Sequence, residues 1–381
     1  MTWTEGKCSR GFHRGAIVQH VVLATTLALV ISIVSAAPLE AESGHGIPST
    51  PTPLFGVGIA RCTFIDHSRS AMNYSTSPPR VLAGGRRLLT EIRYPIQLRP
   101  GEPAESSGAT PAPHAGGYPM VVFAHGYDVT PDTYAALLDV WVRSGFVVVA
   151  PFFPDEAAGE VAAQHGANTE GDLANEPGDL AFITQSVLEA SRGETTNCHI
   201  VNGLVEASQI ALAGHSDGAE AVGMLAYDHG DDPQGVNYAS LRSRLSYRAV
   251  IILSGAEDTA QSYATEASRP DLLVVQSLAD QCNPMRFAVQ LYDGIHQSNK
   301  WFLELQTAHH LPPFDGVDAS AFGVVATTTV AFLRFSLDGV TPSTSLVELG
   351  SQRPSIARMF FGARGISMKD VEPVTEMCGP N

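Results

Sequence analysis

Short, wholly apolar runs alternate along the central part of the chain with longer segments whose apolar residues recur three and four positions apart. The first kind of run is typical of strands buried on both faces, and the second is typical of helices with one apolar face. In residues 132–144, for example, one helical face carries Tyr134, Leu137 and Trp141. This alternation predicts an α/β fold, with a mainly parallel sheet and helices on both of its faces.

The same pattern predicts eight strands and four main helices. The strands are expected at residues 57–65, 87–94, 121–124, 146–150, 209–213, 249–253, 272–276 and 301–305. The helices are expected at residues 132–144, 178–190, 219–227 and 319–337. One domain over residues 54–340 accounts for all of them. Residues 37–53, rich in Pro, Ser, Gly and Thr, indicate a flexible linker, and residues 341–381 are a C-terminal extension expected to pack on the domain.

Residues 1–36 have the pattern of an export signal. Three basic residues precede the apolar run Val21–Val34, and small residues follow at the position where a signal peptidase would cleave, near Ala36. A retained single-span anchor is the alternative, because Ala16–Ala37 is just long enough to cross a bilayer. The sequence favours cleavage, and hence a secreted or periplasmic protein.

Net charge and cysteine content limit the kinds of partner and metal site to expect. The formal net charge of −16 disfavours nucleic acid and anionic lipid, which would be repelled. We therefore expect no nucleic-acid partner and no stable membrane partner beyond export. We also expect a monomer. Four cysteines follow the signal, namely Cys62, Cys198, Cys282 and Cys378. They indicate disulfides, with all three pairings open, and none has the spacing of a zinc cluster, so no metal is expected.

A predicted nucleophile lies in residues 214–218, Gly-His-Ser-Asp-Gly, which fit the pattern G-x-S-x-G between a buried strand and a small-residue helix. Glycines two positions before and after Ser216 let the backbone turn sharply and raise the hydroxyl above the sheet. The N-terminus of the following helix directs its free amides toward charge that develops there. An ordinary strand-to-helix turn is the alternative.

A nucleophilic serine needs a base, and the base needs an orienting acid. Asp280 follows the strand predicted at 272–276 and is favoured as the acid, with Asp258, after the preceding strand, as its rival. Two adjacent histidines, His309 and His310, follow the last parallel strand and are the main candidates for the base. Their order along the chain, serine, acid and then histidine, agrees with the order in one known class of hydrolase.

An oxyanion site is predicted beside the nucleophile. Residues 125–127, His-Gly-Tyr, end the strand predicted at 121–124, and their loop should lie beside the strand-to-helix turn. The backbone amides of Tyr127 and Asp217 are the expected donors to an oxyanion.

Three stretches resemble the bacterial lipase and cutinase branch of the α/β-hydrolases, and plasma-type platelet-activating-factor acetylhydrolases and dienelactone-hydrolase-like proteins share the pattern. The stretches are 123–127 (Phe-Ala-His-Gly-Tyr), 144–151 (Ser-Gly-Phe-Val-Val-Val-Ala-Pro) and 214–218. Residues 302–310 are similar to a polyester-hydrolase stretch in which Leu-Glu-Leu leads into Ala-x-His, which places the base on His310 rather than His309. The resemblance implies an α/β-hydrolase fold and a serine hydrolase that cleaves carboxylic esters through an acyl-enzyme, without a cofactor.

Two other functions stay open on this sequence: a secreted peptidase or amidase with the same triad, and a non-catalytic binding protein of the same fold. The acidic Asp217, where many cutinases have a bulky residue, and the tail after Thr341 both weaken the case for polyester as the substrate. The connection between the strands predicted at 249–253 and 272–276 is short, which leaves no room for a large lid and predicts an open cleft.

Overall fold

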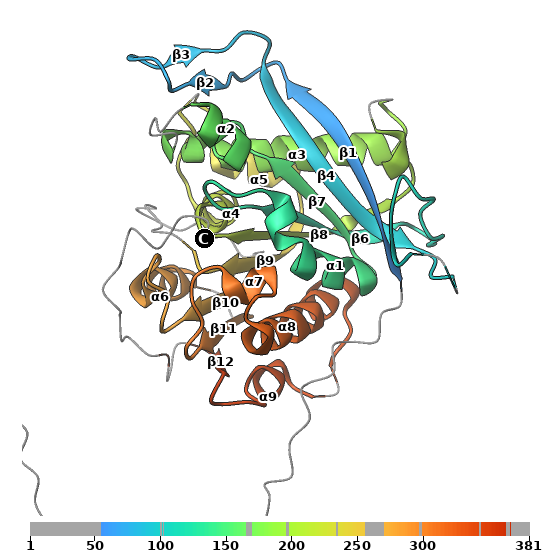
Figure 1. Ribbon diagram of the computed structural model, residues 1–381, viewed down its shortest axis with the longest axis vertical. Coiled ribbons are helices and arrows are strands. Elements are labelled where there is room, and N and C mark those ends of the chain that lie inside the picture. The colour runs from blue at the N-terminus through green and yellow to red at the C-terminus, as the bar shows by residue number, and fades with distance from the viewer. Residues whose placement is uncertain are drawn as a thin grey trace, which may run out of the picture. The chain divides into compact units, whose positions relative to one another are not determined.

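A ten-stranded, mostly parallel sheet forms the centre of the described chain (Figure 1). Its strands are β1 (Gly56–Asp66), β4 (Arg86–Ile96), β5 (Glu105–Ser107), β6 (Tyr118–Ala124), β7 (Val147–Phe152), β8 (Val205–His215), β9 (Tyr247–Leu253), β10 (Asp271–Ser277), β11 (Lys300–Leu305) and β12 (Ala357–Phe361). They lie in the order β12-β11-β10-β9-β8-β6-β7-β4-β1-β5, and the six from β11 to β7 are parallel. All eight predicted strands are present, and β5 and β12 extend the sheet at its two edges.

The computed structural model describes residues 55–362 and 366, except 100, 102, 165–169, 196–197, 234, 256–269, 297–298 and 343. All of these belong to the unit Gly46–Asn381. The predicted signal at 1–36, the whole of the predicted linker at 37–53 and the end of the C-terminal extension lie outside the described residues. A separate pair of short strands, β2 (Met72–Asn73) and β3 (Arg80–Val81), forms a small second sheet.

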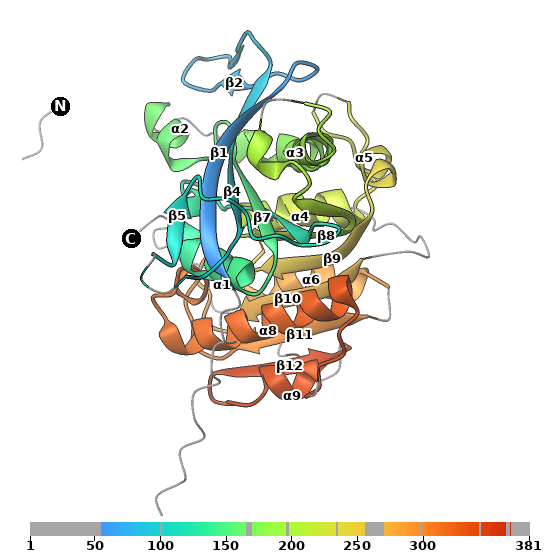
Figure 2. The same cartoon turned by 90° about the vertical axis from the view of Figure 1, so that its right-hand side faces the viewer.

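Helices cover both faces of the large sheet (Figure 2). The helices and 3₁₀ turns are η1 (Pro131–Tyr134), α1 (Ala135–Arg143), α2 (Ala158–Ala163), η2 (Glu170–Asn175), α3 (Glu176–Ser191), η3 (His199–Val201), α4 (Asp217–Tyr227), α5 (Tyr238–Arg244), α6 (Met285–Gly294), α7 (Pro312–Asp315), α8 (Ala319–Asp338) and α9 (Leu346–Gly350). The helices α3, α4 and α6 pack on one face, and α1 and α8 pack on the other. By length and composition α8 alone among the described helices is apolar enough to cross a membrane, but 61% of its most apolar window is buried in the fold.

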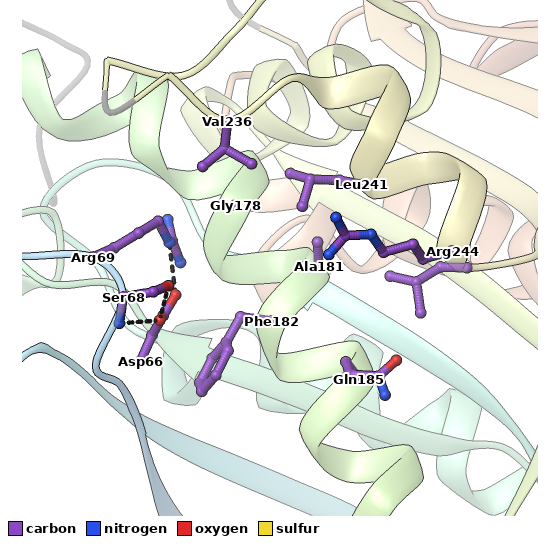
Figure 3. A pocket seen from close by; sticks show the side chains of 11 residues that line it. Asp66, Ser68, Arg69, Gly178, Ala181, Phe182, Gln185, Val236, Leu241 and Arg244 are labelled. Carbon is purple, nitrogen blue, oxygen red and sulfur yellow. Dashed lines mark hydrogen bonds and ion pairs between the residues drawn. The ribbon is translucent and has the colours of Figure 1, made fainter.

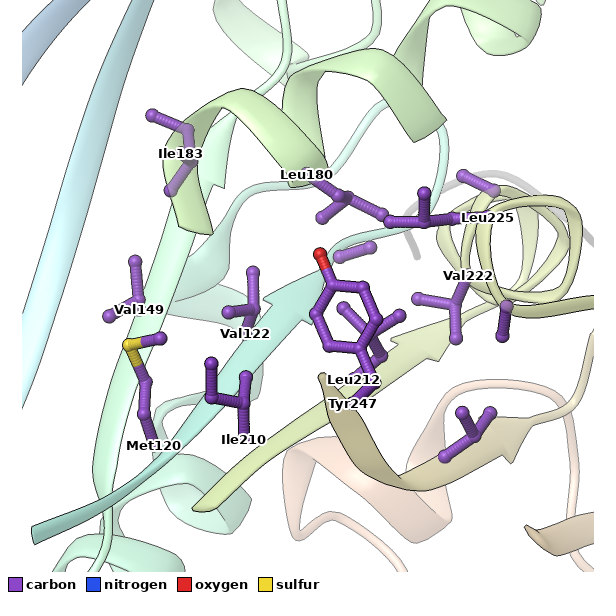
Figure 4. Packing of buried hydrophobic residues seen from close by; sticks show 14 of the residues in the cluster. Met120, Val122, Val149, Leu180, Ile183, Ile210, Leu212, Val222, Leu225 and Tyr247 are labelled. Atoms are coloured by element: carbon purple, nitrogen blue, oxygen red, sulfur yellow. The ribbon is translucent and has the colours of Figure 1, made fainter. Parts of the chain in front are cut away.

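The alternation of side chains along each strand divides the core in two. Met120 and Val122 of β6 point toward α3 and α4, where they join a cluster with Leu180 (Figure 4). Val121 and Phe123 of the same strand belong to the cluster under α1 and α8. Because both faces are covered, β6 is apolar throughout, as the continuous apolar run in the sequence predicts.

The path of the chain through the sheet fixes where a site can form. From β6 the chain crosses to β7 on one side, and it later returns to form β8 on the other side of β6. The switch point of the sheet therefore lies at the carboxyl ends of these two strands, where open α/β sheets generally bind their ligands. Ser216 follows β8, and Tyr127 lies in the loop after β6.

A buried network of ion pairs joins the β1–β4 hairpin to α3. Arg86, at the start of β4, donates to Asp172 in η2 and to Asp179 in α3, the latter at 2.6 Å. Arg69, just after β1, donates to Asp66 at 2.7 Å and to Asp179 at 2.6 Å. All five side chains are buried, so each charge depends on its partners for compensation.

One disulfide joins β1 to the segment that follows α3. Cys62 and Cys198 are bonded, with 5.7 Å between their Cα atoms and 136 positions between them in sequence. This bond selects one of the three pairings that the sequence left open. Cys282 is also disulfide-bonded, and Cys378 lies outside the described residues.

We expect Arg86→Met to destabilise the fold strongly, because it leaves the carboxylates of Asp172 and Asp179 buried with less compensation. Breaking a buried pair in this way costs about 3–5 kcal/mol of unfolding free energy, measurable by urea denaturation. Arg192→Ala is the control: it removes an ion pair with Glu194 that lies on the surface, and should change stability little. Equal midpoints for the two variants would contradict the role given to Arg86.

We expect the double substitution Cys62→Ser, Cys198→Ser to lower the unfolding free energy by about 2–5 kcal/mol, because the bond closes a long loop and restricts the unfolded chain. Guanidinium denaturation of wild type and variant measures the difference. An unchanged midpoint would show that this bond contributes nothing to stability.

Candidate active site

Ser216 lies in a sharp turn between β8 and α4, and its backbone is strained. Its φ and ψ are 54° and −124°, a region that residues with a side chain rarely adopt. A Cβ on Gly214 would lie 2.2 Å from the carbonyl oxygen of Gly218, and a Cβ on Gly218 would lie 2.4 Å from the carbonyl oxygen of His125. Glycine is therefore required at both flanking positions of the G-x-S-x-G pattern.

The loop after β6 borders the turn at Ser216. A Cβ on Gly126 would come within 3.0 Å of the Cβ of Ser216. Tyr127 follows Gly126 directly, and Asp217 begins α4 on the other side of the serine. The structure thus places the two predicted oxyanion donors, the backbone amides of Tyr127 and Asp217, on the two segments that meet at Ser216.

Asp280 and His310 form a hydrogen-bonded pair. The Nδ1 atom of His310 lies 3.1 Å from Oδ1 and 3.0 Å from Oδ2 of Asp280, whose side chain is buried. Oδ1 also accepts the backbone N–H groups of Cys282 and Asn283, at 2.9 and 3.0 Å. Burial raises the pKa of Asp280, but His310 and these amides lower it more, so the pKa lies below its ordinary value. Asp280 is therefore a carboxylate that fixes a proton on Nδ1 of His310 and leaves Nε2 as the acceptor.

Of the two adjacent histidines, the structure brings His310 and not His309 to the acid. His309 is exposed, whereas the ring of His310 lies against the ring of His215, with 4.5 Å between their centroids. The rival acid, Asp258, lies outside the described residues. The geometry therefore agrees with the choice that the resemblance made.

The bond between base and nucleophile is not formed in this structure. The Oγ atom of Ser216 lies 3.4 Å from Nδ2 of Asn283 and 3.5 Å from Oδ1 of Asp217. No hydrogen bond joins Ser216 to His310, both of which are described. Contacts of this kind are often longer without substrate and shorten in the complex.

A chain of hydrogen bonds that the sequence did not predict links the oxyanion loop to the base. The Nε2 atom of His215 lies 3.2 Å from the carbonyl oxygen of His310, so it carries the proton and donates. Nδ1 of His215 therefore accepts from the hydroxyl of Tyr134 at 2.8 Å, and this hydroxyl accepts from the backbone N–H of Gly126 at 3.2 Å. Burial holds the pKa of His215 well below its ordinary value, so the ring stays neutral and the direction of these bonds is fixed.

His125 anchors the same loop to the neighbouring strand. Its Nε2 accepts the backbone N–H of Phe153 at 3.1 Å, and its Nδ1 lies 2.8 Å from the carbonyl oxygen of Gly126. Burial lowers the pKa of His125 to about 4, so it also acts as a neutral hydrogen-bonding group. The sequence pattern predicted His125 only as the start of the oxyanion loop and Tyr134 only as part of an apolar helical face. It did not predict the hydrogen bonds of either side chain.

Asn283 was also missed from the sequence, although it lies three residues after the predicted acid. Its side chain donates to the carbonyl oxygen of Ser254 at 2.8 Å, besides its contact with Ser216. Gln276 supports the same loop by donating to Asp280 and to the carbonyl oxygen of Asn283. The acid loop is therefore held by the side chain of Gln276 on β10 and by the bond from Asn283 to the residue after β9, as well as by its own amides.

The acid and base also belong to a group with the spacing of metal ligands. Ligand atoms of Asp280, Cys282 and His310 all lie within 4.8 Å of one another. Cys282 is disulfide-bonded, however, and so is no thiolate, while Nδ1 of His310 is occupied by Asp280. The chemistry of this group fits an acid–base pair beside a disulfide better than it fits a metal centre.

A groove elsewhere on the domain is separate from these residues. It has a volume of about 700 Å³ and lies between α3 and α5 (Figure 3). Phe182 and Leu241 form apolar walls, and Arg69 of the buried ion network lies at its edge. Its lining includes none of the predicted catalytic residues. The residues between β9 and β10 that bear on the predicted open cleft are largely outside the described chain, and that expectation stays a prediction.

Comparison with known proteins agrees with this architecture. A family model described as chlorophyllase matches residues 97–278, slightly under half of the chain; the match includes Ser216 and ends before Asp280. Among solved structures, the ferulic acid esterase from Streptomyces cinnamoneus is 18% identical, with a TM-score of 0.59, and the alignment covers 83% of this chain and 98% of that chain. No curated protein matches the chain. The structural likeness confirms the α/β-hydrolase fold that the sequence motifs imply.

We expect His310→Ala to abolish the reaction of Ser216 with a fluorophosphonate probe, because it removes the group that accepts the serine proton. His309→Ala is the matched control and should label at close to the wild-type rate, since its ring is exposed and lies away from Asp280. Mass spectrometry of labelled peptides gives both rates. Loss of labelling in the His309 variant alone would reverse the assignment.

Proposed function

We propose that this chain is an exported serine hydrolase that cleaves carboxylic esters through an acyl-enzyme intermediate. The observation that carries the proposal is the Asp280–His310 pair, which lies beside the strained turn of Ser216 at the switch point of the sheet. Strained backbone at the switch point of a sheet, together with a buried acid bonded to a histidine, fits the arrangement that nucleophilic acyl transfer requires.

In the first half of the reaction, Nε2 of His310 accepts the proton of Ser216 as Oγ attacks the ester carbonyl carbon. The carbonyl oxygen becomes an oxyanion, which the backbone amides of Tyr127 and Asp217 stabilise. The tetrahedral intermediate then expels the alcohol, which takes the proton from His310. Asp280 holds the imidazole in the required tautomer throughout.

In the second half, His310 takes a proton from water, which attacks the carbonyl carbon of the acyl-serine. The second tetrahedral intermediate uses the same oxyanion donors. Its collapse releases the carboxylic acid and returns the proton from His310 to Oγ of Ser216. These reaction steps balance in atoms and protons without a metal or a cofactor.

The comparisons support an ester as the substrate. The chlorophyllase family model covers the oxyanion loop and the nucleophile, and the structural neighbour is named for esters of ferulic acid. We propose lipase-, esterase- or cutinase-like action, and the alcohol and acyl chain remain to be assigned by assay. The disulfides support an oxidising compartment, as export would give.

We expect Ser216→Ala to lower kcat/KM for short-chain p-nitrophenyl esters by about 10⁴-fold or more, because no acyl-enzyme can form. Fluorophosphonate labelling should disappear as well, while the circular dichroism spectrum and Tm stay close to those of the wild type.

Ser254→Ala is the matched control for this variant. Ser254 ends the neighbouring strand, is buried and also has a positive φ, and its removal should leave labelling intact. Persistent labelling of the Ser216 variant would contradict the proposal. Faster cleavage of peptide anilides than of esters would instead identify a peptidase with the same triad.

A further inference from the structure

Glu176 is a buried carboxyl group that the proposed mechanism does not use. It begins α3 and is 1% exposed, and within the described part of the chain neither of its carboxyl oxygens has a hydrogen-bond partner. A charged carboxylate is strongly disfavoured in such a site, whereas the neutral acid is tolerated. A buried polar group without a partner is rare in folded proteins and requires an explanation.

The surroundings of Glu176 are mostly negative. The acids that act on it directly are Glu156, Asp217, Asp179 and Asp172, and the elements packed around it also carry Asp155, Glu220, Asp232, Arg69, Arg86, Arg242 and Arg244. Arg69 and Arg86 both bind Asp179, and Arg86 binds Asp172 as well, so in the described chain these two cations are committed to other acids. Burial raises the pKa of Glu176 well above its ordinary value, and the charges of Glu156 and Asp217 raise it further.

Two of these neighbours lie on segments that build the proposed oxyanion site. Asp217 supplies one of its amides. Glu156 lies in the loop after β7, and its carbonyl oxygen accepts the N–H of Asp128 at 2.9 Å. The N–H of Ala158 donates to the carbonyl oxygen of Val129 at 3.2 Å. A displacement of Glu156 would therefore be passed to the residues that follow Tyr127.

We propose that Glu176 is a positioning residue whose proton holds the oxyanion site in its working geometry. While Glu176 is neutral, it packs beside Glu156 and Asp217 without repulsion. When it ionises, it repels the Glu156 carboxylate and so displaces the loop that is bonded to Asp128. It also adds negative charge beside Asp217, whose amide is one of the proposed oxyanion donors. The inference rests on the proposed function, because only a reaction through an oxyanion needs this site.

The direction of the pH effect follows from the protons bound in each state. The folded protein holds the proton of Glu176 to a higher pH than the unfolded chain does. Between those two pKa values the folded state binds more protons, so stability falls as the pH rises through this interval and stops falling once the folded group has ionised. Glutamine has nearly the same shape and no charge, so Glu176→Gln removes this fall.

The test compares wild type with Glu176→Gln from about pH 5 to about pH 10. Thermal unfolding is expected to show a Tm difference in favour of the variant that grows with pH. In the wild type, kcat for a short-chain ester should fall about tenfold per pH unit once Glu176 ionises, while KM changes little. The Glu176→Gln variant should lack this alkaline fall of kcat. The Ser216→Ala variant gives the background rate of ester hydrolysis at each pH.

Two further variants make the comparison specific. Glu105→Gln removes an exposed carboxyl on β5 and should follow the wild type in both measurements. Glu156→Gln keeps Glu176 but removes a negative neighbour that raises its pKa, so Glu176 should ionise more easily and the alkaline fall should move to lower pH without disappearing. A Tm difference that does not change with pH would overturn the proposal, because Glu176 would then hold no proton. The same alkaline fall of kcat in wild type and in Glu176→Gln would also overturn the proposal. The proton of Glu176 would then affect stability without affecting the reaction.

Failure of the proposed function has a different signature. If the wild type labels at Ser216 but hydrolyses no ester, the pH dependence of the labelling rate replaces that of kcat and tests Glu176 in the same way, since phosphonylation also uses the oxyanion amides. If Ser216 does not label at any pH, the proposed function and this inference are both overturned.

Discussion

The close approach of backbones around Ser216 is the constraint on which the rest of the site depends. The loop after β6, the end of β8 and the start of α4 meet so closely that Gly126, Gly214 and Gly218 leave no room for a side chain. The left-handed backbone of Ser216 stores strain of about 1–3 kcal/mol. It persists because β8 is paired on both sides and α4 is buried from Gly218 to Tyr227, so neither element can shift to relieve it.

The buried charges form a second level of organisation around this turn. Arg69 and Arg86 together hold three carboxylates, those of Asp66, Asp172 and Asp179, so the network as a whole stays negative. It fixes the first turns of α3, and thereby the position of Glu176. The same interactions that attach the hairpin to the helix thus create the negative surroundings in which a further carboxyl is more stable when protonated.

The sequence was sufficient to predict the central strands and the sharp turn at Ser216, because each has a local pattern. It could not choose between His309 and His310 on physical grounds, since adjacent residues in a loop point in directions that only the folded backbone sets. The edge strand β5 is polar and forms only because β1 offers a free edge. Tyr134 and Glu176 were missed for a related reason. Tyr134 lies on an apolar helical face, where an aromatic residue is normally predicted to be part of the core. Glu176 lies in a first helical turn, where an acid is normally predicted to be a favourable surface charge.

A chain of hydrogen bonds runs from Gly126 through Tyr134 and His215 to the carbonyl oxygen of His310. This chain limits which substitutions the protein can accept during evolution. A lineage that exchanged His215 alone would leave the Tyr134 hydroxyl proton buried without an acceptor, and one that exchanged Tyr134 alone would do the same to the amide of Gly126. Each single exchange leaves a buried donor without its acceptor. Positions 134 and 215 are therefore energetically coupled, although 81 positions separate them along the chain, and a substitution at either one has to be judged together with the other.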